Sequence, residues 1–378
     1  MRVAGRIWTQ AKGWSAGASG TDALDPQFVL FFGARAAVER AGTLAGLQRD
    51  YPKALLIGCS TGGEIYGRDV HDDTIVAAAV RLERSSIRQA SVVVDAMEQS
   101  LAAGRKLGAE LAGAHLSAIL VLSDGTRVNG SALVRGLREA VGDALPIVGG
   151  MAGDGTHFQT TMVGAGAAPA PRVVAALGFY GRSLSIGHGS IGGWNVFGPL
   201  RTITKSAGNV LYELDGKPAL DLYKSYLGDE AEGLPASALL FPLTIRPPGK
   251  SGHEVVRTII GLDEAARSMI FAGDMPEGYV AQLMVGNTRN LIEGAGRAAQ
   301  HAAAVGGSGD RLAILVSCVG RKWLLGQRIA EEIEAVADAL PAATQIGFYS
   351  YGEIAPHAHS GVCELHNQTM TVTVFAER

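Results

Sequence analysis

The sequence predicts an α/β protein of two related halves, with mixed, partly parallel sheets flanked by helices and a pseudo-symmetry produced by internal duplication. Residues 118–146 recur without a gap as residues 313–341, and 12 of the 29 aligned positions are identical. Both copies have the order apolar run, amphipathic helix, proline, apolar run, glycine, and residues 28–58 show the same order. Repeated strand–helix–strand units are typical of α/β folds. A duplicated fold also predicts a cleft lined by matching elements of the copies.

The two copies of the repeat predict matching elements. Each opens with a short apolar run bounded by glycine, which is typical of a buried strand. A helix is then expected, because apolar residues recur at helical spacing up to a helix-stopping proline. The expected strands are 117–122 and 312–316, and the expected helices are 133–141 and 329–336.

The remaining segments predict further strands, helices and turns. A strand at 28–32, a helix at 37–47 and a strand at 54–57 form the third strand–helix–strand unit, and Thr74–Val80 is a further strand. Hairpin-like pairs are expected for 157–163 with 172–180 and for 268–272 with 279–285. Pro218 and Gly228 are expected to begin and end a helix. The halves are placed at residues 25–215 and 216–378.

Composition excludes several classes of protein. A formal net charge of −3 gives no basic field for nucleic acid. No segment approaches the ~18 apolar residues of a membrane span, and the N-terminal residues lack the apolar core of a signal peptide. The three cysteines are scattered, with no Cys-x-x-Cys pair. The cytoplasm is therefore the expected location.

Three related turns are the best candidate ligand-binding elements. Ile57–Ile65 and Ile346–Ile354 share five of nine positions, and Val148–Asp154 is a looser version. Ligands of α/β proteins usually bind where strands end in such turns. The candidate lining residues are Cys59, Ser60, Thr61 and Glu64 from one turn and Tyr349, Tyr351 and Glu353 from the other. Alternatively, each glutamate bonds to backbone N–H groups of its own turn and has a structural role.

Cys318 and Arg321 follow a predicted buried strand and complete the candidate set. A cation beside a cysteine at the end of a strand would lower the pKa of the thiol and attract an anionic ligand, whereas an inert, half-buried thiol is the alternative. Residues 58–62 also match the Gly-x-Ser-x-Gly nucleophile elbow of hydrolases, with Ser60 as nucleophile. That motif requires a following helix, whereas a strand is expected here.

The chain resembles the FIST family of bacterial ligand-sensing proteins, and the resemblance extends over nearly the whole sequence in order. The matching segments are Gly58–Ile65 and Pro146–Asp154 in the first half, and Asn209–Ala219, Phe271–Gly278, Ser317–Arg321, Gly347–Ile354 and Leu365–Met370 in the second. The resemblance implies a sensory, non-enzymatic module for small ligands such as amino acids. Stand-alone members are similar to haem proteins that sense nitric oxide and control a partner histidine kinase.

The resemblance therefore favours haem as cofactor and a separate histidine kinase or other signalling protein as partner. It is also compatible with a homodimer. His188 is the expected axial ligand, since glycines on both sides would allow close approach of a planar macrocycle. An amino-acid or metabolite sensor without haem remains the alternative. Duplication further predicts that Glu64 and Glu353 face one shared pocket across a pseudo-two-fold axis, which would raise the pKa of each.

Overall fold

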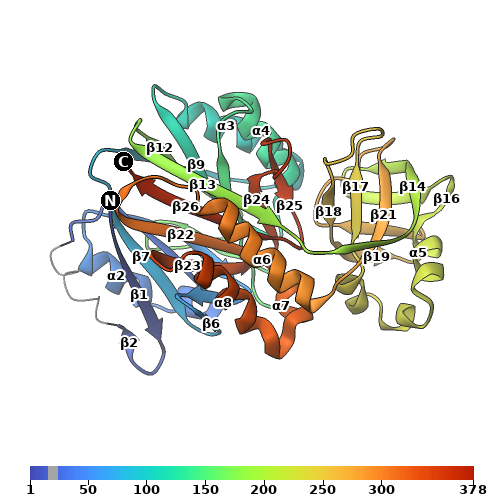
Figure 1. The fold of residues 1–378 in the computed structure, drawn as a ribbon, viewed down its shortest axis with the longest axis horizontal. Coiled ribbons are helices and arrows are strands. Elements are labelled where there is room, and N and C mark those ends of the chain that lie inside the picture. Colours follow the sequence, from blue (N-terminus) through green and yellow to red (C-terminus); the bar gives the residue numbers. More distant parts are fainter. Residues whose placement is uncertain (16–23) are drawn as a thin grey trace.

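The computed structural model describes residues 1–15 and 24–378. It consists of a larger part, the α/β body (1–15, 24–194 and 286–378), and a smaller one, the β-domain (195–285), which lies at one end of it (Figure 1). The body contains three six-stranded sheets, and the β-domain has its own sheet.

Sheet 1 carries the first strand–helix–strand unit. In spatial order it contains β11 (Val163–Ala165), β4 (Leu55–Thr61), β3 (Phe28–Ala34), β7 (Ile75–Arg81), β1 (Arg2–Thr9) and β2 (Gly13–Trp14). The β3–β4 pair is parallel. Between them, α1 (Arg35–Glu39) and α2 (Thr43–Asp50) cover the outer face of the sheet. The helix predicted over 37–47 is interrupted by Gly42, whose φ of 85° lies in the left-handed region.

Sheet 2 carries the first copy of the sequence repeat. Its order is β25 (Cys363–His366), β24 (Gly352–Pro356), β10 (Ile147–Met151), β9 (Leu116–Ser123), β12 (Val173–Tyr180) and β8 (Ser86–Val93). The β9–β10 pair is parallel. The helices α3 (Ser100–Leu111) and α4 (Gly130–Val141) pack against each other and on the outer face of this sheet.

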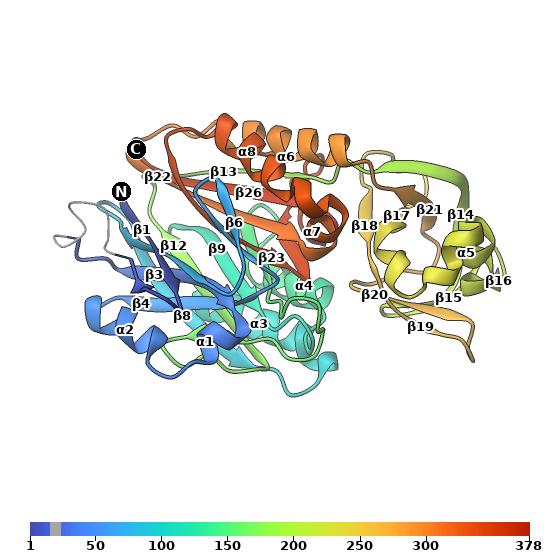
Figure 2. The ribbon, with the colours of Figure 1, turned by 90° about the horizontal axis from the view of Figure 1, so that it is seen from below.

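Sheet 3 carries the second copy. Its order is β13 (Leu184–Ile191), β26 (Met370–Glu377), β22 (Ser308–Cys318), β23 (Ala343–Ser350), β5 (Glu64–Tyr66) and β6 (Asp69–His71). The β22–β23 pair is again parallel. Its outer face is covered by α6 (Thr288–Ala302) and α8 (Ile329–Ala339), while α7 (Val319–Leu325) follows β22 directly. Figure 2 shows α6 and α8 on the opposite side of the body from α1 and α2.

The inner faces of the three sheets meet in one central core. Alternation along each strand sends every second side chain inward, so Phe28, Leu120 and Ile314 pack in the shared cluster. Their chain neighbours Val29, Ile119 and Ala313 instead contact the outer helices. The body is therefore three helix-covered sheets around a common apolar centre.

The three units exchange strands in a cycle. After β4 of sheet 1, the chain crosses to sheet 3, where β5 pairs with β23. After β23, the chain crosses to sheet 2, where β24 pairs with β10. Earlier in the chain, after β10, it crosses to sheet 1, where β11 pairs with β4. The duplication found in the sequence thus belongs to a set of three units, which includes residues 28–58.

One glycine in each unit is explained by close backbone contact. A Cβ added to Gly58 would lie 2.1 Å from the carbonyl oxygen of Phe31. At Gly149 and Gly347, the same atom would lie 1.9 Å and 2.1 Å from carbonyl oxygens of the parallel neighbouring strand. A side chain does not fit at these equivalent positions, so the repeated glycine is a packing requirement.

The β-domain is an eight-stranded sheet with a core of its own. The strands of its main path are β18 (Val255–Arg257), β17 (Leu243–Arg246), β21 (Val280–Val285), β14 (Asn195–Ala207), β15 (Val210–Leu214), β20 (Ser268–Phe271) and β19 (Ile259–Asp263), and β16 (Lys217–Pro218) pairs with β15. The helix α5 (Ala219–Leu227) packs on it between Pro218 and Gly228, as predicted.

Both predicted hairpins are wrong. The segment 157–163 forms a strand only from Val163, in sheet 1, whereas β12 belongs to sheet 2. Likewise β20 pairs with β15 and β19, while β21 pairs with β14 and β17. In both places the expected partners pair with other strands instead, and β20 forms its hairpin with the preceding strand β19. In the described part of the chain, the helices are too short or too polar to cross a membrane.

Candidate functional site

The ends of the three exchanged strands meet in a closed ring of backbone hydrogen bonds. Gly62 N donates to Tyr349 O at 2.7 Å, Tyr351 N donates to Met151 O at 3.2 Å, and Gly153 N donates to Ser60 O at 2.9 Å. In each bond the donor follows its own strand end and the acceptor belongs to the neighbouring unit. The three turns that the sequence analysis selected are therefore brought together, but through backbone atoms.

The two glutamates occupy matching environments within this ring. Glu64 accepts from Thr61 Oγ1, from Thr74 N at 3.1 Å and from Thr74 Oγ1 at 2.7 Å. Glu353 accepts in the same way from Ser350 Oγ at 2.7 Å, Thr369 N at 3.0 Å and Thr369 Oγ1 at 2.9 Å. Burial raises the pKa of each carboxyl group to about 7, against the opposing effect of these hydrogen bonds.

These glutamates do not face each other across one pocket. Glu64 lines a cavity at the end of β4, whereas Glu353 is enclosed by its own turn and by Thr369. Desolvation, not mutual repulsion, is the main cause of the raised pKa values. The geometry therefore corresponds to the structural alternative for Glu353, and Glu64 combines that role with a place in a cavity wall.

Ser60 and Cys59 are fully buried. Ser60 Oγ donates to Gly153 O at 2.7 Å and accepts from Met162 N at 2.9 Å, so both hydrogen-bonding functions are used by backbone groups. The segment after it is the strand β5 and not the helix of a nucleophile elbow. Cys59 packs in the central core, where burial raises the pKa of its thiol.

Arg321 forms a buried ion pair with Glu332. Its Nη2 lies 2.6 Å from Glu332 Oε1, and both side chains are fully buried. The guanidinium also donates to Leu291 O at 2.9 Å and to Gly192 O. Tyr349 OH donates to the other oxygen of Glu332 at 3.3 Å. Arg321 and Tyr349 thus join α7, α6, α8 and the residue after β13, and neither lines a cavity described below.

Of the two alternatives for Cys318, the activated thiol is contradicted. Burial raises the pKa of the Cys318 thiol, and the nearby charge of Glu353 raises it further, while Arg321 opposes this only weakly. The guanidinium is already neutralised by Glu332. Cys318 is therefore the inert buried thiol of the alternative interpretation.

Tyr351 points from the strand ring towards the β-domain. Its hydroxyl donates to Asp154 Oδ1 and accepts from Phe158 N at 3.2 Å. Its ring stacks on Phe158 with centroids 4.4 Å apart and an interplanar angle of 13°. Burial tends to raise the pKa of Asp154, but hydrogen bonds from Tyr351 and from three backbone N–H groups lower it overall. The Tyr351–Phe158 pair is therefore fixed by an ionised carboxylate.

A cavity of about 210 Å³ lies between this aromatic pair and the β-domain. The body contributes apolar and amide side chains from the 3-10 turn at 97–99, the start of α4 and the strand ring. The β-domain contributes the turn between β14 and β15, the strand β19 and the end of β20 with the residues after it. The lining residues are Met97, Gly125, Thr126, Val128, Asn129, Met151, Phe158, Tyr351, Asn209, Ile260, Phe271, Ala272 and Gly273. None of these side chains carries a formal charge. We call this space the interdomain cavity.

A second cavity, of about 390 Å³, lies at the end of β4. Thr61 and Glu64 line it together with acidic side chains of the β6–β7 connection and of the 154–159 segment, and with Arg35 and His157. Arg35 Nη1 lies 3.6 Å from Asp154 Oδ2. Thr61 and Glu64 therefore face a different cavity from Tyr351, and the candidate set does not form one site.

His188 lies on β13, paired with Thr373. The glycines beside it face α6, where a Cβ on Gly187 or Gly189 would lie 2.2 Å or 2.1 Å from carbonyl oxygens, whereas His188 points to the other face of the strand. Their role is close helix–strand packing. Burial lowers the pKa of His188. Within the described ranges, no three His, Cys, Asp or Glu side chains are grouped to hold a metal ion.

Sequence reasoning missed most of the interdomain cavity. Asn129, Phe158 and Ile260 were not selected, because the docking of the β-domain on the body depends on contacts far apart in sequence. Two signals were present. Asn209 and Phe271–Gly273 belong to segments that carry the family resemblance.

Comparisons with known proteins give two domain matches that follow each other along the chain. A FIST N domain matches residues 27–217 and a FIST C domain matches residues 219–356. Comparison with curated proteins gives no match. Among solved structures, a cyanuric acid hydrolase from A. caulinodans is similar with 12% identity and a TM-score of 0.38, over 100% of this chain and 99% of that one. The two domain matches cover most of the chain, which therefore belongs to the FIST family of signal-transduction sensor domains that bind small ligands.

Proposed function

We propose that this protein senses a small uncharged molecule that binds in the interdomain cavity. The main support for the proposal is the cavity wall, which is formed by uncharged side chains of both the body and the β-domain. A ligand there contacts Phe158 and Tyr351 of the body and Phe271 and Ile260 of the β-domain. Binding between domains links occupancy to their relative position, as a signalling module requires.

The wall chemistry defines the ligand class. The stacked pair Phe158–Tyr351 offers an aromatic face, and Asn129 and Asn209 supply amide groups. Asn129 Nδ2 already donates to Asp274 Oδ1 at 2.8 Å, and Asn209 Nδ2 donates to Phe271 O at 2.8 Å, so these amides are held in place. A free ammonium or carboxylate would lose its hydration without gaining a counter-charge. A neutral, planar molecule with hydrogen-bonding groups therefore suits this cavity better than a zwitterionic amino acid.

Haem does not fit at His188 or at His157. His188 lies beside glycines that are packed against α6, and it lines none of the cavities described above. His157 lines the cavity at the end of β4, but that wall carries Glu64, Asp72, Asp73 and Asp154, which would repel the propionates and offer no apolar face. No step of the proposed mechanism involves haem or nitric oxide.

The output of the sensor is proposed to be contact with a separate signalling protein, such as a histidine kinase. Asp274 of the β-domain bonds to Asn129 at the start of α4 and lies 3.5 Å from Arg135 on the same helix. A ligand beside Asn129 changes this docking contact directly. The surfaces of α4 and the β-domain then present a different relative position to a partner.

A blocked cavity tests the proposal. Ile260 is half-exposed in the cavity wall, so Ile260→Trp fills the space, while Leu200→Trp places the same ring on an exposed position of the same domain. A panel of neutral nucleobases, aromatic amides and free amino acids is screened by thermal shift. We expect neutral planar compounds to raise the melting temperature of wild type and Leu200→Trp but not of Ile260→Trp. Equal responses of all three proteins, or a response only to amino acids, would contradict the proposal.

A further inference from the structure

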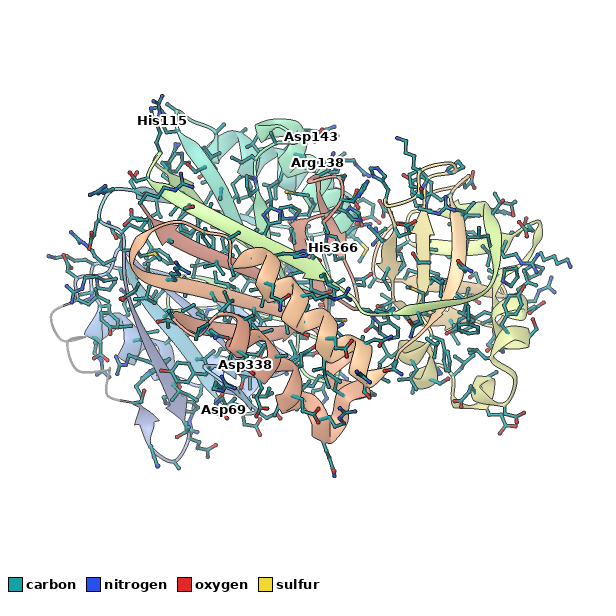
Figure 3. The ribbon with its side chains drawn as sticks, in the orientation of Figure 1. Asp69, His115, Arg138, Asp143, Asp338 and His366 are labelled. Atoms are coloured by element: carbon teal, nitrogen blue, oxygen red, sulfur yellow. The ribbon has the colours of Figure 1, made fainter. Side chains whose placement is uncertain are left out.

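A separate cavity of about 200 Å³ lies between α4, β25 and the β-domain, next to the interdomain cavity. One face of α4 lines it through Ser131, Val134, Arg135 and Arg138, at the spacing of successive helical turns. Asp274 separates the two cavities, since its carboxylate bonds to Asn129 of one and lies beside Arg135 of the other. Figure 3 labels Arg138 and Asp143 at the end of α4 and shows that this helix faces the β-domain.

Arg257 is the unusual residue of this cavity. Only 6% of it is exposed. Nε donates to Asp274 O at 3.0 Å, and Nη1 donates to Val256 O at 3.1 Å and Leu365 O at 3.0 Å. Among the described residues, no hydrogen bond uses Nη2 and no carboxylate lies within ion-pair distance. Burial lowers the pKa of the guanidinium, yet an arginine stays protonated at neutral pH.

A buried cation without a counter-charge is costly, and it is usually compensated by an anion. The acidic groups of the cavity wall, Glu364 and Asp274, oppose the effect of burial on the pKa of Arg257, but neither forms an ion pair with it among the described residues. Asp274 is engaged by Asn129 and Arg135, and Glu364 lines the wall without an ion pair to Arg257. Arg138 is paired with Asp143 at 2.8 Å, outside the wall. Two arginines and two acidic side chains then remain in the wall, and Arg257 is the arginine without an ion pair among the described residues.

The donors in the cavity wall suit an oxyanion. Arg135 lies at the rim with half of its side chain exposed and only a 3.5 Å contact to Asp274, so its guanidinium can turn towards a ligand. Ser131, Tyr279 and His253 add donors from both domains. Two guanidinium groups and hydroxyl groups around one small cavity are the arrangement that recognises carboxylate or phosphate oxygens.

We propose that this cavity is a binding site for a small oxyanion, a carboxylate or phosphate group of a metabolite, held by Arg257 and Arg135. The site is distinct from the cavity assigned to the neutral ligand. Because its walls come from α4 and β25 of the body and from β17, β18 and the 272–279 segment of the β-domain, an anion bound here fastens the two parts to each other. Anion occupancy then stabilises one relative position of the domains.

Titration calorimetry with inorganic phosphate and with succinate, at ionic strength held constant with NaCl, tests the site. Arg257→Gln removes the buried donor, and Arg135→Gln removes the rim donor without touching the core. Arg105→Gln is the matched control, because Arg105 is an exposed arginine of α3 that pairs with Glu139. We expect saturable binding of at least one anion to wild type and Arg105→Gln, and about a tenfold loss of affinity in Arg135→Gln.

The outcomes separate the possible ligands and the possible failures. Tighter phosphate binding identifies a phosphate group as the ligand class, and tighter succinate binding identifies a carboxylate. Circular dichroism establishes that each variant is folded, and Arg135→Gln keeps the test valid if Arg257→Gln is not. The absence of saturable binding of either anion to wild type, or equal affinities of Arg135→Gln and Arg105→Gln, would overturn the proposal.

Discussion

At the scale of single residues, the sequence identified which residues occupy equivalent positions more reliably than it identified what those residues do. Glu64 and Glu353 were matched from a five-of-nine turn similarity, and the structure gives them the same set of hydroxyl and backbone donors. Nothing in the turn sequence distinguishes a carboxylate that binds a ligand from one that binds its own turn, because both need a buried acceptor beside glycine. Thr74 and Thr369, which decide the matter, lie 10 and 16 residues further along the chain.

These buried carboxyl groups predict a pH dependence of stability. Each has a pKa of about 7 in the folded protein and an ordinary value of 4.5. The folded state therefore binds more protons between these two values, and stability falls as pH rises from about 5 to 8. Each group is expected to change the free energy of unfolding by about 2 kcal/mol over this range.

Urea unfolding at pH 5.5 and pH 8 measures this effect. Glu64→Gln and Glu353→Gln remove the titrating group, so the difference in stability between the two pH values shrinks in each variant. Glu139→Gln, an exposed carboxylate, is the control and keeps the wild-type difference. A pH dependence that stays the same in both buried variants would show that these groups are ionised throughout.

The buried pair of Arg321 and Glu332 gives a second residue-scale prediction. Removing one partner leaves the other charge buried without compensation, so Arg321→Met is expected to cost about 3–5 kcal/mol of stability. The double variant Arg321→Met with Glu332→Leu removes both charges and should recover much of that loss. Denaturant unfolding of the single and double variants measures the coupling. A small loss in Arg321→Met, with no recovery in the double variant, would contradict a structural role for this pair.

At the scale of elements, apolar periodicity predicted the positions of strands and helices well, whereas local turn signals predicted strand pairing poorly. The repeated strands and helices appear as β9, α4 and β10 and as β22, α8 and β23, because each has a clear apolar pattern and a terminating proline or glycine. Strand partners do not follow from such local patterns. The strand after each central turn leaves its own unit and pairs with a neighbour, which contradicts the first expected hairpin. The second is wrong because β20 and β21 pair with other strands of the β-domain. The interdomain cavity was missed for a similar reason, since it joins Tyr351 to β-domain residues that lie far away in sequence.

A matched pair of glycine substitutions tests the packing argument for the repeated strand glycine. In Gly347→Ala, the new Cβ would lie 2.1 Å from Leu315 O, a backbone atom that cannot move freely, so we expect a loss of about 1–3 kcal/mol. In Gly296→Ala, on α6, the nearest atom is 3.5 Å away and φ is not positive. There alanine should stabilise the helix by about 0.5–1 kcal/mol. Thermal unfolding of both variants checks the opposite signs, and a neutral Gly347→Ala would contradict the clash.

At the scale of the whole molecule, the fold consists of an interlocked body and an inserted β-domain. Each of the three body sheets needs strands from more than one unit, so no unit completes its sheet alone. The β-domain, in contrast, has its own sheet and core and joins the body through adjacent strand ends, since Asn195 pairs with Val285. The division of the sequence at residue 216 falls in the turn between β15 and β16, inside the β-domain. Sequence similarity divides the chain into consecutive segments, whereas the parts that fold cooperatively are sheets built from several of these segments.

This architecture predicts which fragments fold. Residues 1–215 alone lack β22, β23 and β26, which are the centre of sheet 3, and β24 and β25, which complete sheet 2. Large apolar faces of the central core would then be exposed, so we expect this fragment to be unfolded or aggregated.

Deletion of residues 196–284, with a short Gly-Ser linker between Asn195 and Val285, leaves all three body sheets intact and should give a folded, cooperatively unfolding protein. Amide dispersion in NMR spectra and thermal unfolding distinguish the two fragments. A well-dispersed spectrum for residues 1–215 would show that the strand exchange is dispensable. A folded body without the β-domain also provides a receptor that lacks the interdomain cavity, and it should retain the core but lose the ligand response.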